Sequence, residues 1–397
     1  MDILYEYSLG KIRRTRLGFK RKFINSNVWN NRLTGILGAR GSGKTTLMLQ
    51  YMKENFKIRP EALYISLDNL YFTENTLLGL AEKFVKNGGR FLFIDEVHKY
   101  ANWSIEIKNI YDTFDELKVV FTGSSMLNIQ KSEADLSRRA VVWHLPGLSF
   151  REYIELELGE RFPILTLDEI LANHTEIAAG VCDKLRPIAA FNQYLKHGYY
   201  PFFKEGKDFY NQKLQATIGA IIETDVPAIH HVDYYTVNKI KKLLYILAKS
   251  VPFQPNITTL AGSLGAIRGS VLQFLDILES ANLINQLRSP SHSDSILTKP
   301  DKIYLNNTNL SYAIAEHAPD LGNLRETFFL NQMRANYKVH FTKTGDFLVN
   351  QSMTFEVGGR SKSNQQIKDV ENAYIAADDI EMGVGHTIPL WLFGMMY

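Results

Sequence analysis

The stretch "GARGSGKTT", residues 38–46, follows the apolar run "LTGIL" at 33–37. After it, "TTLMLQYMKENF" carries apolar residues at helical spacing, which predicts an amphipathic helix. A strand, a glycine-rich loop and a helix in this order let backbone N–H groups curl around phosphates. The positive end of the helix dipole then faces the same point. The sequence therefore predicts a phosphate-binding loop.

The residue types in this loop predict how a nucleoside triphosphate is held. Lys44 is expected to reach the β- and γ-phosphates, and the Thr45 hydroxyl to ligate Mg²⁺. ATP and Mg²⁺ are the expected ligands. The predicted nucleotide-binding residues are Gly38, Ala39, Arg40, Gly41, Ser42, Gly43, Lys44, Thr45 and Thr46.

A second signal lies in "RFLFIDEVHKY", residues 90–100, an apolar strand that ends in two carboxylates. Asp95, at the carboxyl end of this strand, is placed to hold the Mg²⁺ shell. Glu96 is the natural base or orienting group for the attacking water. The spacing from the loop leaves room for a helix, a strand at 62–68 and another helix.

A third strand, "KVVFTGSSMLNI" at 118–129, includes Ser124 and Ser125 near its end. A serine here can contact the γ-phosphate or the attacking water, and for each serine a purely structural place is an equal alternative. Arg138 and Arg139 follow as candidates for an arginine finger, which stabilises charge on the transferred phosphoryl group. We select Ser124 and Arg139 as catalytic candidates beside Lys44 and Glu96.

These runs, with "LPGLSFREY" and "HGYYP" further on, resemble the archaeal-type AAA ATPases over essentially the whole chain. The resemblance implies an α/β P-loop core with a parallel sheet, a sensor serine and a catalytic arginine. In that family the arginine usually follows a glycine, whereas Arg139 follows Arg138. Either arginine therefore remains a candidate for the finger.

Composition sets wider limits on the class of protein. A net charge of +3 is too small to indicate a nucleic-acid partner, and a single cysteine, Cys182, excludes an internal disulfide. The basic stretch 11–22 is either a solvated arm or a surface facing phosphates or nucleic acid. No apolar run approaches the ~20 residues that span a bilayer. We expect a cytoplasmic protein without membrane contact.

Changes of pattern along the chain predict four segments. We assign 1–150 to the ATPase core, 151–235 to a helical lid or connector, 236–306 to a winged helix and 307–397 to a C-terminal α/β domain. Three helices within 237–287, followed by a returning strand, make the winged-helix pattern.

The third helix of this pattern, "RGSVLQFLDILESANLI", would offer DNA three polar side chains. Its Asp276 and Glu279 would repel phosphates, so docking on protein is the alternative. The three side chains are Arg268, Ser270 and Gln273.

The last segment is expected to contain a helix with Glu326, a hairpin with Asp346 and a strand with Glu356. We further expect a helix at 364–379 and a final buried strand at 387–397. This order resembles the restriction-endonuclease-like core, which implies three acids that bind Mg²⁺.

In that core a lysine two residues after the last acid assists the reaction, but here the position is Gly358. Without that cation a major electrostatic term is missing. We predict a degenerate domain without nuclease activity that acts as a binding platform. Three other basic residues could fill the gap: Lys343, Arg360 and Lys362.

The combined hypothesis is an Mg²⁺-dependent ATPase that switches its C-terminal domains, with a homo-oligomer and a protein partner as further expectations. One alternative is a nucleic-acid-binding module whose nucleotide site only regulates affinity. Another is a protein-interaction switch in signalling or defence. The salt dependence of DNA affinity separates these two.

Overall fold

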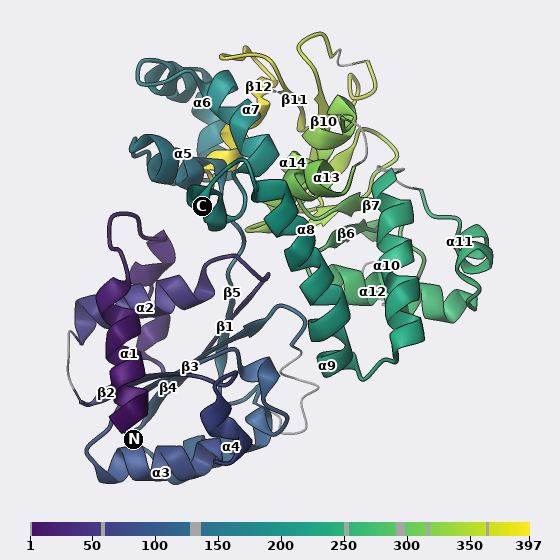
Figure 1. The fold of residues 1–397 in the computed structure, drawn as a ribbon. Coiled ribbons are helices and arrows are strands. Elements are labelled where there is room, and N and C mark those ends of the chain that lie inside the picture. Colours follow the sequence, from purple (N-terminus) through teal and green to yellow (C-terminus); the bar gives the residue numbers. More distant parts are fainter. Residues whose placement is uncertain are drawn as a thin grey trace. The chain divides into compact units, whose positions relative to one another are not determined.

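The computed structural model describes residues 2–56, 60–127, 136–249, 254–290, 298–315, 318–362 and 365–397 (Figure 1). Contacts divide the chain into two compact units. The N-terminal unit consists of Met1–Pro146 and Thr224–Val232, and the C-terminal unit of Gly147–Glu223 and Asp233–Tyr397. The short piece Thr224–Val232 thus belongs to the N-terminal unit, although both of its neighbours in sequence belong to the other unit.

The N-terminal unit is built on a sheet of five parallel strands in the order β2-β3-β4-β1-β5. The strands are β1 (Leu33–Gly38), β2 (Ala62–Ser66), β3 (Phe91–Asp95), β4 (Lys118–Ser124) and β5 (Val141–His144). Gly38 pairs with Ser124, and Ser66 pairs with Asp95. The register therefore brings the carboxyl ends of four strands to one edge, where ligands of open α/β sheets bind.

Helices cover both faces of this sheet, because its strands are apolar on both sides. Leu37 and Ile94 belong to one hydrophobic cluster, whereas their neighbours Ile36 and Phe93 belong to the other. Side chains of α3 and α4 fill the first cluster, and those of α2 fill the second. The helices of this unit are α1 (Asp2–Arg14), α2 (Lys44–Asn55), α3 (Leu77–Lys86), α4 (Trp103–Thr113) and α9 (Val226–His230).

The predicted α/β P-loop fold with a parallel core sheet is confirmed. The third predicted strand is shorter than expected, since β4 ends at Ser124 and a turn follows. Residues 128–129 of that prediction lie outside the described residues.

The C-terminal unit begins with a helical region and ends with a mixed sheet. Its helices are α5 (Phe150–Leu158), α6 (Leu167–Cys182), α7 (Pro187–His197), α8 (Tyr210–Ala220), α10 (Tyr234–Lys249), α11 (Ile257–Leu264), α12 (Arg268–Ser280), α13 (Thr308–Ile314) and α14 (Leu321–Arg334). An antiparallel pair, β6 (Ile284–Leu287) and β7 (Lys302–Leu305), follows α12 in sequence. Side-chain oxygens of Ser149, Thr166 and Asn256 cap α5, α6 and α11.

The last sheet has the order β12-β11-β10-β9-β8, with antiparallel pairs at its β8 end and parallel pairs at its β12 end. Its strands are β8 (Val339–His340), β9 (Phe347–Val349), β10 (Met353–Gly358), β11 (Ala373–Ala377) and β12 (Thr387–Pro389). The predicted helix with Glu326, the hairpin around Asp346 and the strand with Glu356 are confirmed as α14, β8–β9 and β10.

Three predicted elements in this unit were wrong in part. The third helix of the 237–287 region ends at Ser280, and Asn282 adopts a left-handed φ of 56° before β6. The predicted helix at 364–379 contains β11, because Ala376 and Ala377 are buried where β11 pairs with two neighbouring strands. Tertiary pairing here overrides the helix preference of alanine. The predicted final strand ends at Pro389, and Leu390–Met395 form a 3-10 helix.

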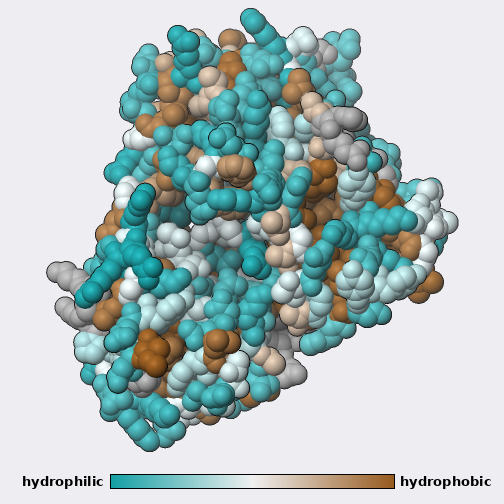
Figure 2. Space-filling model, viewed as in Figure 1, coloured by the Kyte–Doolittle hydropathy of each residue, from teal (hydrophilic) through white to brown (hydrophobic). Residues whose placement is uncertain are grey.

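Figure 2 shows a mostly hydrophilic face in which hydrophobic side chains form separate groups. Among the residues described by the structure, no helix combines the length and apolar character needed to cross a membrane.

The start of the loop makes a close contact that predicts a stability effect. A Cβ added to Gly38 would lie 2.5 Å from the backbone oxygen of Leu145, which cannot move easily. We expect Gly38→Ala to lower the free energy of unfolding by about 1–3 kcal/mol through this overpacking. Gly18→Ala is the matched control, since nothing lies within 4 Å of its added Cβ. Urea unfolding of both variants measures the difference, and equal midpoints would contradict it.

Candidate functional site

The predicted phosphate loop joins the end of β1 to the first residue of α2. Gly41 and Gly43 have φ angles of 84° and 95°, which residues with side chains rarely adopt. Lys44 is 6% exposed, and its Nζ donates to the carbonyl oxygens of Gly38 at 2.9 Å and Ala39 at 3.0 Å. The lysine ammonium therefore lies inside the curve of the loop, where phosphate oxygens would bind.

The electrostatics of Lys44 reflect two opposing effects. Burial lowers the pKa of its ammonium, and nearby carboxylates, first that of Glu96, oppose the shift. Burial removes the water that would stabilise the ammonium charge. An anionic ligand such as phosphate would stabilise this charge instead, so the buried lysine is well suited to bind one.

Asp95 is the centre of a hydrogen-bond network at the carboxyl edge of the sheet. Its side chain accepts hydrogen bonds from the hydroxyls of Thr45 at 2.8 Å and Tyr64 at 2.9 Å, and from Thr122. These donors come from α2, β2 and β4. Burial, followed by the neighbouring carboxylate of Asp95, raises the pKa of Tyr64 far above its usual range, so the phenol stays a donor.

The predicted Mg²⁺ ligands Thr45 and Asp95 are thus brought together. A hydroxyl and a carboxylate at one edge are hard oxygen donors of the kind that Mg²⁺ prefers. In the described parts of the chain, no three His, Cys, Asp or Glu side chains gather closely enough to hold a metal ion. Two protein oxygens are consistent with a Mg²⁺ ion that takes its other ligands from phosphate and water.

Glu96 adopts an unusual backbone conformation. Its φ of 56° is left-handed, which is strained for a residue with a side chain. Its N–H donates to the Thr122 hydroxyl at 3.2 Å, and its side chain is 29% exposed. Its carboxylate faces His98, so the two adjacent acids occupy different environments.

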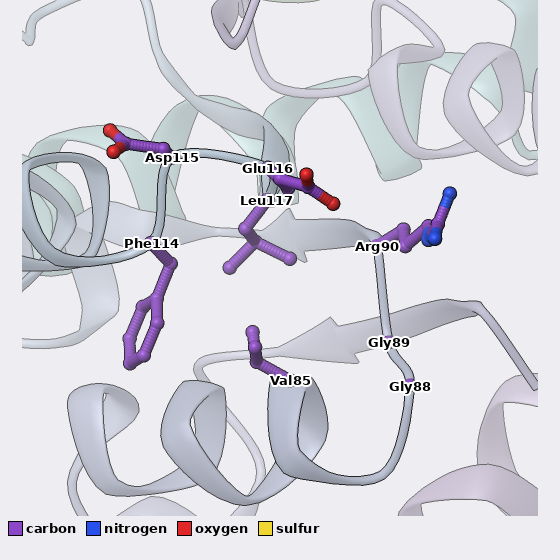
Figure 3. Close-up of a pocket in the computed structure, with 8 residues that line it drawn as sticks. All are labelled: Val85, Gly88, Gly89, Arg90, Phe114, Asp115, Glu116 and Leu117. Carbon is purple, nitrogen blue, oxygen red and sulfur yellow. The ribbon is translucent and has the colours of Figure 1, made fainter.

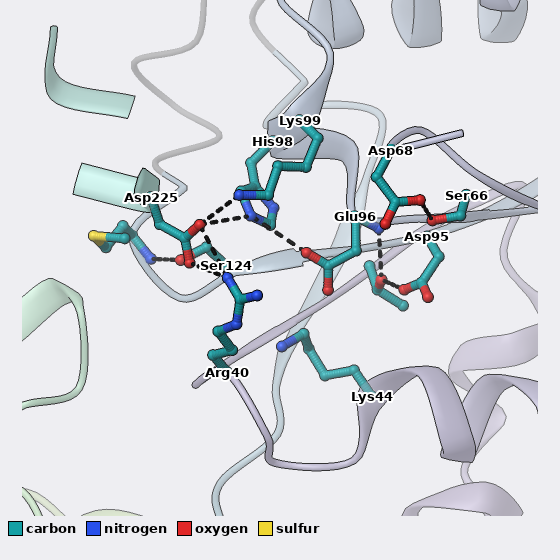
Figure 4. Close-up of polar contacts among 12 residues, drawn as sticks. Arg40, Lys44, Ser66, Asp68, Asp95, Glu96, His98, Lys99, Ser124 and Asp225 are labelled. Carbon is teal, nitrogen blue, oxygen red and sulfur yellow. Dashed lines mark hydrogen bonds and ion pairs between the residues drawn. The ribbon is translucent and has the colours of Figure 1, made fainter. Parts of the chain in front are cut away.

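A set of ion pairs lies beside Glu96, centred on Asp225 of the piece Thr224–Val232 (Figure 4). Asp225 pairs with Nζ of Lys99 at 2.6 Å and with Nη1 of Arg40 at 3.3 Å. Nε2 of His98 lies 3.7 Å from Asp225 and 3.3 Å from Glu96. The loop residue Arg40 therefore points to a carboxylate outside the predicted core.

The other two catalytic candidates, Ser124 and Arg139, have partners within the N-terminal unit. Ser124 ends β4 at the correct edge, and its Oγ accepts a hydrogen bond from the Met126 N–H at 3.3 Å. Arg139 donates to both carboxylate oxygens of Asp112 on α4, at 2.9 and 3.1 Å, while Arg138 is exposed. Arg139 is thus held against α4 of its own chain.

Sequence reasoning missed five residues around the loop edge: Tyr64, Thr122, His98, Lys99 and Asp225. The first four lie within or just after strands that end at this edge, and this position in sequence could have identified them as site residues. No such signal identifies Asp225, because it lies far along the chain from Lys44 and follows a helical region.

A pocket of about 370 Å³ lies at the opposite edge of the same sheet (Figure 3). Arg90 and Leu117 in its wall directly precede β3 and β4, so the pocket opens at the amino ends of these strands. Ligands of parallel α/β sheets bind beyond the carboxyl ends. The loop edge, and not this pocket, is therefore the candidate site.

An acidic cluster lies in the C-terminal unit, where the three predicted acids are found with two lysines. Nζ of Lys302 is 3.6 Å from Glu326 and 3.7 Å from Asp346. Nζ of Lys362 is 2.6 Å from Oε1 of Glu356, which is 1% exposed. Of the three basic residues that could fill the gap at Gly358, Lys362 is the one that pairs with Glu356.

The replacement of the expected lysine has a steric reason. A Cβ at Gly358 would lie 2.6–2.8 Å from three carbons of the Lys362 side chain. The glycine therefore leaves the space through which Lys362 reaches Glu356. Burial raises the pKa of Glu356, and the hydrogen bond from Lys362 opposes that shift. Burial, followed by the charge of Asp346, raises the pKa of Glu326.

Comparison with known proteins agrees with the geometry of the N-terminal unit. Residues 30–154 match the family model of an AAA domain. Residues 30–154 are therefore similar to an AAA domain. Residues 188–320, beyond this domain, match a domain of unknown function (DUF8612).

A curated relative of this chain is an uncharacterised protein of Methanocaldococcus jannaschii, 30% identical over 283 residues. The match covers 68% of this chain and 59% of the relative, so the chain spans less than two thirds of that protein.

Solved structures resemble the chain only distantly. A variant of Thermotoga maritima RuvB is 17% identical with a TM-score of 0.29, over 73% of this chain and 87% of that one. A STAND ATPase with a tetratricopeptide repeat sensor from Pyrococcus horikoshii is 14% identical with a TM-score of 0.29, over 81% and 46%. DnaA from Aquifex aeolicus with bound AMPPCP is 16% identical with a TM-score of 0.26, over 65% and 85%. Structural similarity this low supports no conclusion about function.

The candidate nucleotide site predicts two different kinetic defects. Lys44→Ala should weaken ATP binding on the order of 10²-fold, since a charged group that bonds phosphate is lost. Glu96→Gln should keep ATP affinity and lower kcat by about 10²-fold, because the predicted task of this carboxylate is proton transfer from water. Equilibrium binding of a fluorescent ATP analogue and steady-state hydrolysis separate the two. Hydrolysis at the parent rate by Glu96→Gln would show that Glu96 is not the base.

Proposed function

We propose that the chain is an Mg²⁺-dependent ATPase whose nucleotide cycle switches the C-terminal unit. The observation that carries this proposal is the contact of Thr45 with Asp95 at 2.8 Å, beside the buried Lys44 and the partly exposed Glu96. Each of these residue types has a distinct task in phosphoryl transfer to water, and all four lie at one edge of the sheet.

The residues of the chain would divide the work as follows. Backbone N–H groups of the loop and Lys44 bind the phosphates and compensate their charge. Thr45 and Asp95 would hold Mg²⁺, which when bound neutralises charge on the β- and γ-oxygens. Glu96 accepts the proton of the attacking water, and Ser124 contacts the γ-phosphate or that water.

The test is a steady-state ATPase assay of the purified chain, with Mg²⁺ and with EDTA in its place. Mg²⁺-dependent release of phosphate that Lys44→Ala abolishes supports the proposal. The assay is repeated with DNA, with RNA and with lysate protein, alone and combined. If the chain binds ATP but hydrolyses none under any of these conditions, the site is a regulatory one.

A DNA-binding role is a second candidate, supported by α10–α12 and the antiparallel pair β6–β7. These elements follow one another in the order that a winged helix requires. Arg268 and Gln273 are exposed on α12. Glu279 is paired with Arg334 at 3.2 Å, and Asp276 lies 3.7 Å from Arg288.

The charges that would repel DNA are therefore partly compensated. Affinity that falls steeply with salt would favour this role over a protein-interaction switch. Nucleotide-dependent self-association without DNA affinity would favour the switch.

The arginine finger predicts how activity depends on concentration. If Arg139 acts in a neighbouring copy, activity per chain rises with protein concentration, and Arg139→Ala lowers the rate on the order of 10³-fold. Mixing Arg139→Ala with Lys44→Ala chains should then restore activity, because each copy supplies the part that the other lacks. Arg138→Ala, assayed in parallel, tests the other candidate for the finger. A rate independent of concentration, with no rescue, would contradict action between copies.

The acidic cluster of the C-terminal unit is proposed to be a binding platform without nuclease activity. Lys302 lies within 4 Å of Glu326 and Asp346, and Lys362 pairs with Glu356. Two lysines thus compensate part of the negative charge within the protein, which weakens the attraction of the cluster for a divalent cation.

We therefore expect no metal-dependent cleavage of plasmid or oligonucleotide by the wild-type chain with Mg²⁺ or Mn²⁺. Glu356→Ala and Lys362→Met, assayed in parallel, identify the origin of any cleavage. Cleavage that both variants abolish would show that Lys362 has taken the role of the expected lysine, and the platform proposal would fail.

A further inference from the structure

The piece Thr224–Val232, which we call the return segment, belongs to the ATPase unit although it follows the helical region in sequence. The chain enters it through a π-helical turn at Ile221–Asp225, and π-turns are frequent at functional sites. Val226 is fully buried, and Ile229 packs against the hydrophobic cluster that α3 and α4 fill. Apolar contacts therefore hold the segment in place.

Asp225 is the charged residue of this segment that faces the candidate active site. Its side chain is 3% exposed, so its carboxylate depends on protein partners. Lys99 lies 2.6 Å from it and Arg40 lies 3.3 Å from it. Burial by itself disfavours the charged form, but interactions with His98 and Lys99 hold the pKa of Asp225 well below its usual range.

His98 connects this carboxylate to the predicted base. The imidazole is 3% exposed, and its Nε2 lies 3.7 Å from Asp225 and 3.3 Å from Glu96 (Figure 4). Neither Nδ1 nor Nε2 has a hydrogen-bond partner among the described residues, and the polar contacts of the ring are the two ion-pair approaches of Nε2 to these carboxylates. Loss of the Asp225 carboxylate would remove one of these two contacts and leave the ring facing Glu96 alone.

We propose that Asp225 is a positioning residue for ATP hydrolysis, which acts on Glu96 through His98. The inference rests on the proposed ATPase activity and adds a residue from outside the core to it. Asp225 touches neither ATP nor water in this role. It fixes the side chains that do, and it does so from a segment joined at both ends to the C-terminal unit.

The charge of Asp225 allows a positioning role to be distinguished from a purely structural one. Asp225 is one of the carboxylates that act on Lys44, so its negative charge lies within range of the phosphate loop. By Coulomb's law alone, removal of this negative charge strengthens the attraction of the loop for an anion. A positioning role therefore predicts lower kcat with unchanged or tighter ATP binding, whereas a purely structural role predicts that both are lost.

The experiment compares Asp225→Asn with the wild-type chain. The amide keeps the shape and removes the charge. We expect kcat to fall about ten- to a hundred-fold, since misplacing a catalytic group by about 1 Å can cost 10²-fold. We expect the KM and the Kd for ATP to stay the same or to fall. The matched control is Glu223→Gln, two residues earlier, whose half-exposed side chain pairs with Lys241 and should leave the rate unchanged.

The second arm asks whether Asp225 acts through Glu96. In a Glu96→Gln background, measured by single-turnover hydrolysis, Asp225→Asn should lower the rate further by less than about two-fold, because the group that it positions is already lost. The same ten-fold or larger loss in both backgrounds would overturn the inference. His98→Gln should reproduce the kcat defect, and it serves as the test if Asp225→Asn does not fold.

The outcomes separate the inference from the proposed function. An active wild type with an equally active Asp225→Asn variant overturns the inference alone. A parallel loss of ATP affinity and kcat also overturns it, since that result fits a structural role. A wild-type chain that binds ATP and never hydrolyses it overturns the proposed function, and the inference with it.

Discussion

The buried carboxylate of Asp95 is the constraint on which the arrangement of the candidate site depends. A carboxylate with 3% exposure must find hydrogen-bond donors in the protein. It finds them in Thr45, Tyr64 and Thr122, which come from α2, β2 and β4. The hydrogen bonds to this one carboxylate therefore connect α2 to β2, β4 and β3, the strand that Asp95 ends.

The adjacent acid has the opposite environment, and the difference explains how two neighbouring carboxylates can have separate tasks. Glu96 leaves the strand in a left-handed turn and is partly exposed. Asp95 is fixed by hydroxyl donors, whereas the carboxylate of Glu96 lies 3.3 Å from the His98 ring. A carboxylate held by hydroxyl donors suits metal binding, and a partly exposed carboxylate beside an imidazole suits proton transfer.

The C-terminal unit shows that spacing in sequence does not decide which charges meet. The resemblance to a restriction-endonuclease-like core predicts a lysine two residues after Glu356, where this chain has a glycine. In the folded chain the glycine makes room for Lys362, which reaches the same carboxylate from four residues further on. The charge pattern around an acid depends on which side chains can reach it, and not on their order along the chain.

The sequence by itself determined the α/β core, the loop at residues 38–46 and the strand that ends in Asp95 and Glu96, because glycine turns, apolar periodicity and strand-end polar residues are local signals. It also located α14 and β10 with their acids. Local signals were insufficient at 364–379, where burial between two strands decided for β11 against a helical pattern. Only the tertiary structure brought Asp225 to Arg40 and His98, and Lys362 to Glu356. Ion pairs between residues far apart in sequence depend on how the chain folds back on itself, and the spacing of residue types along the sequence does not predict this.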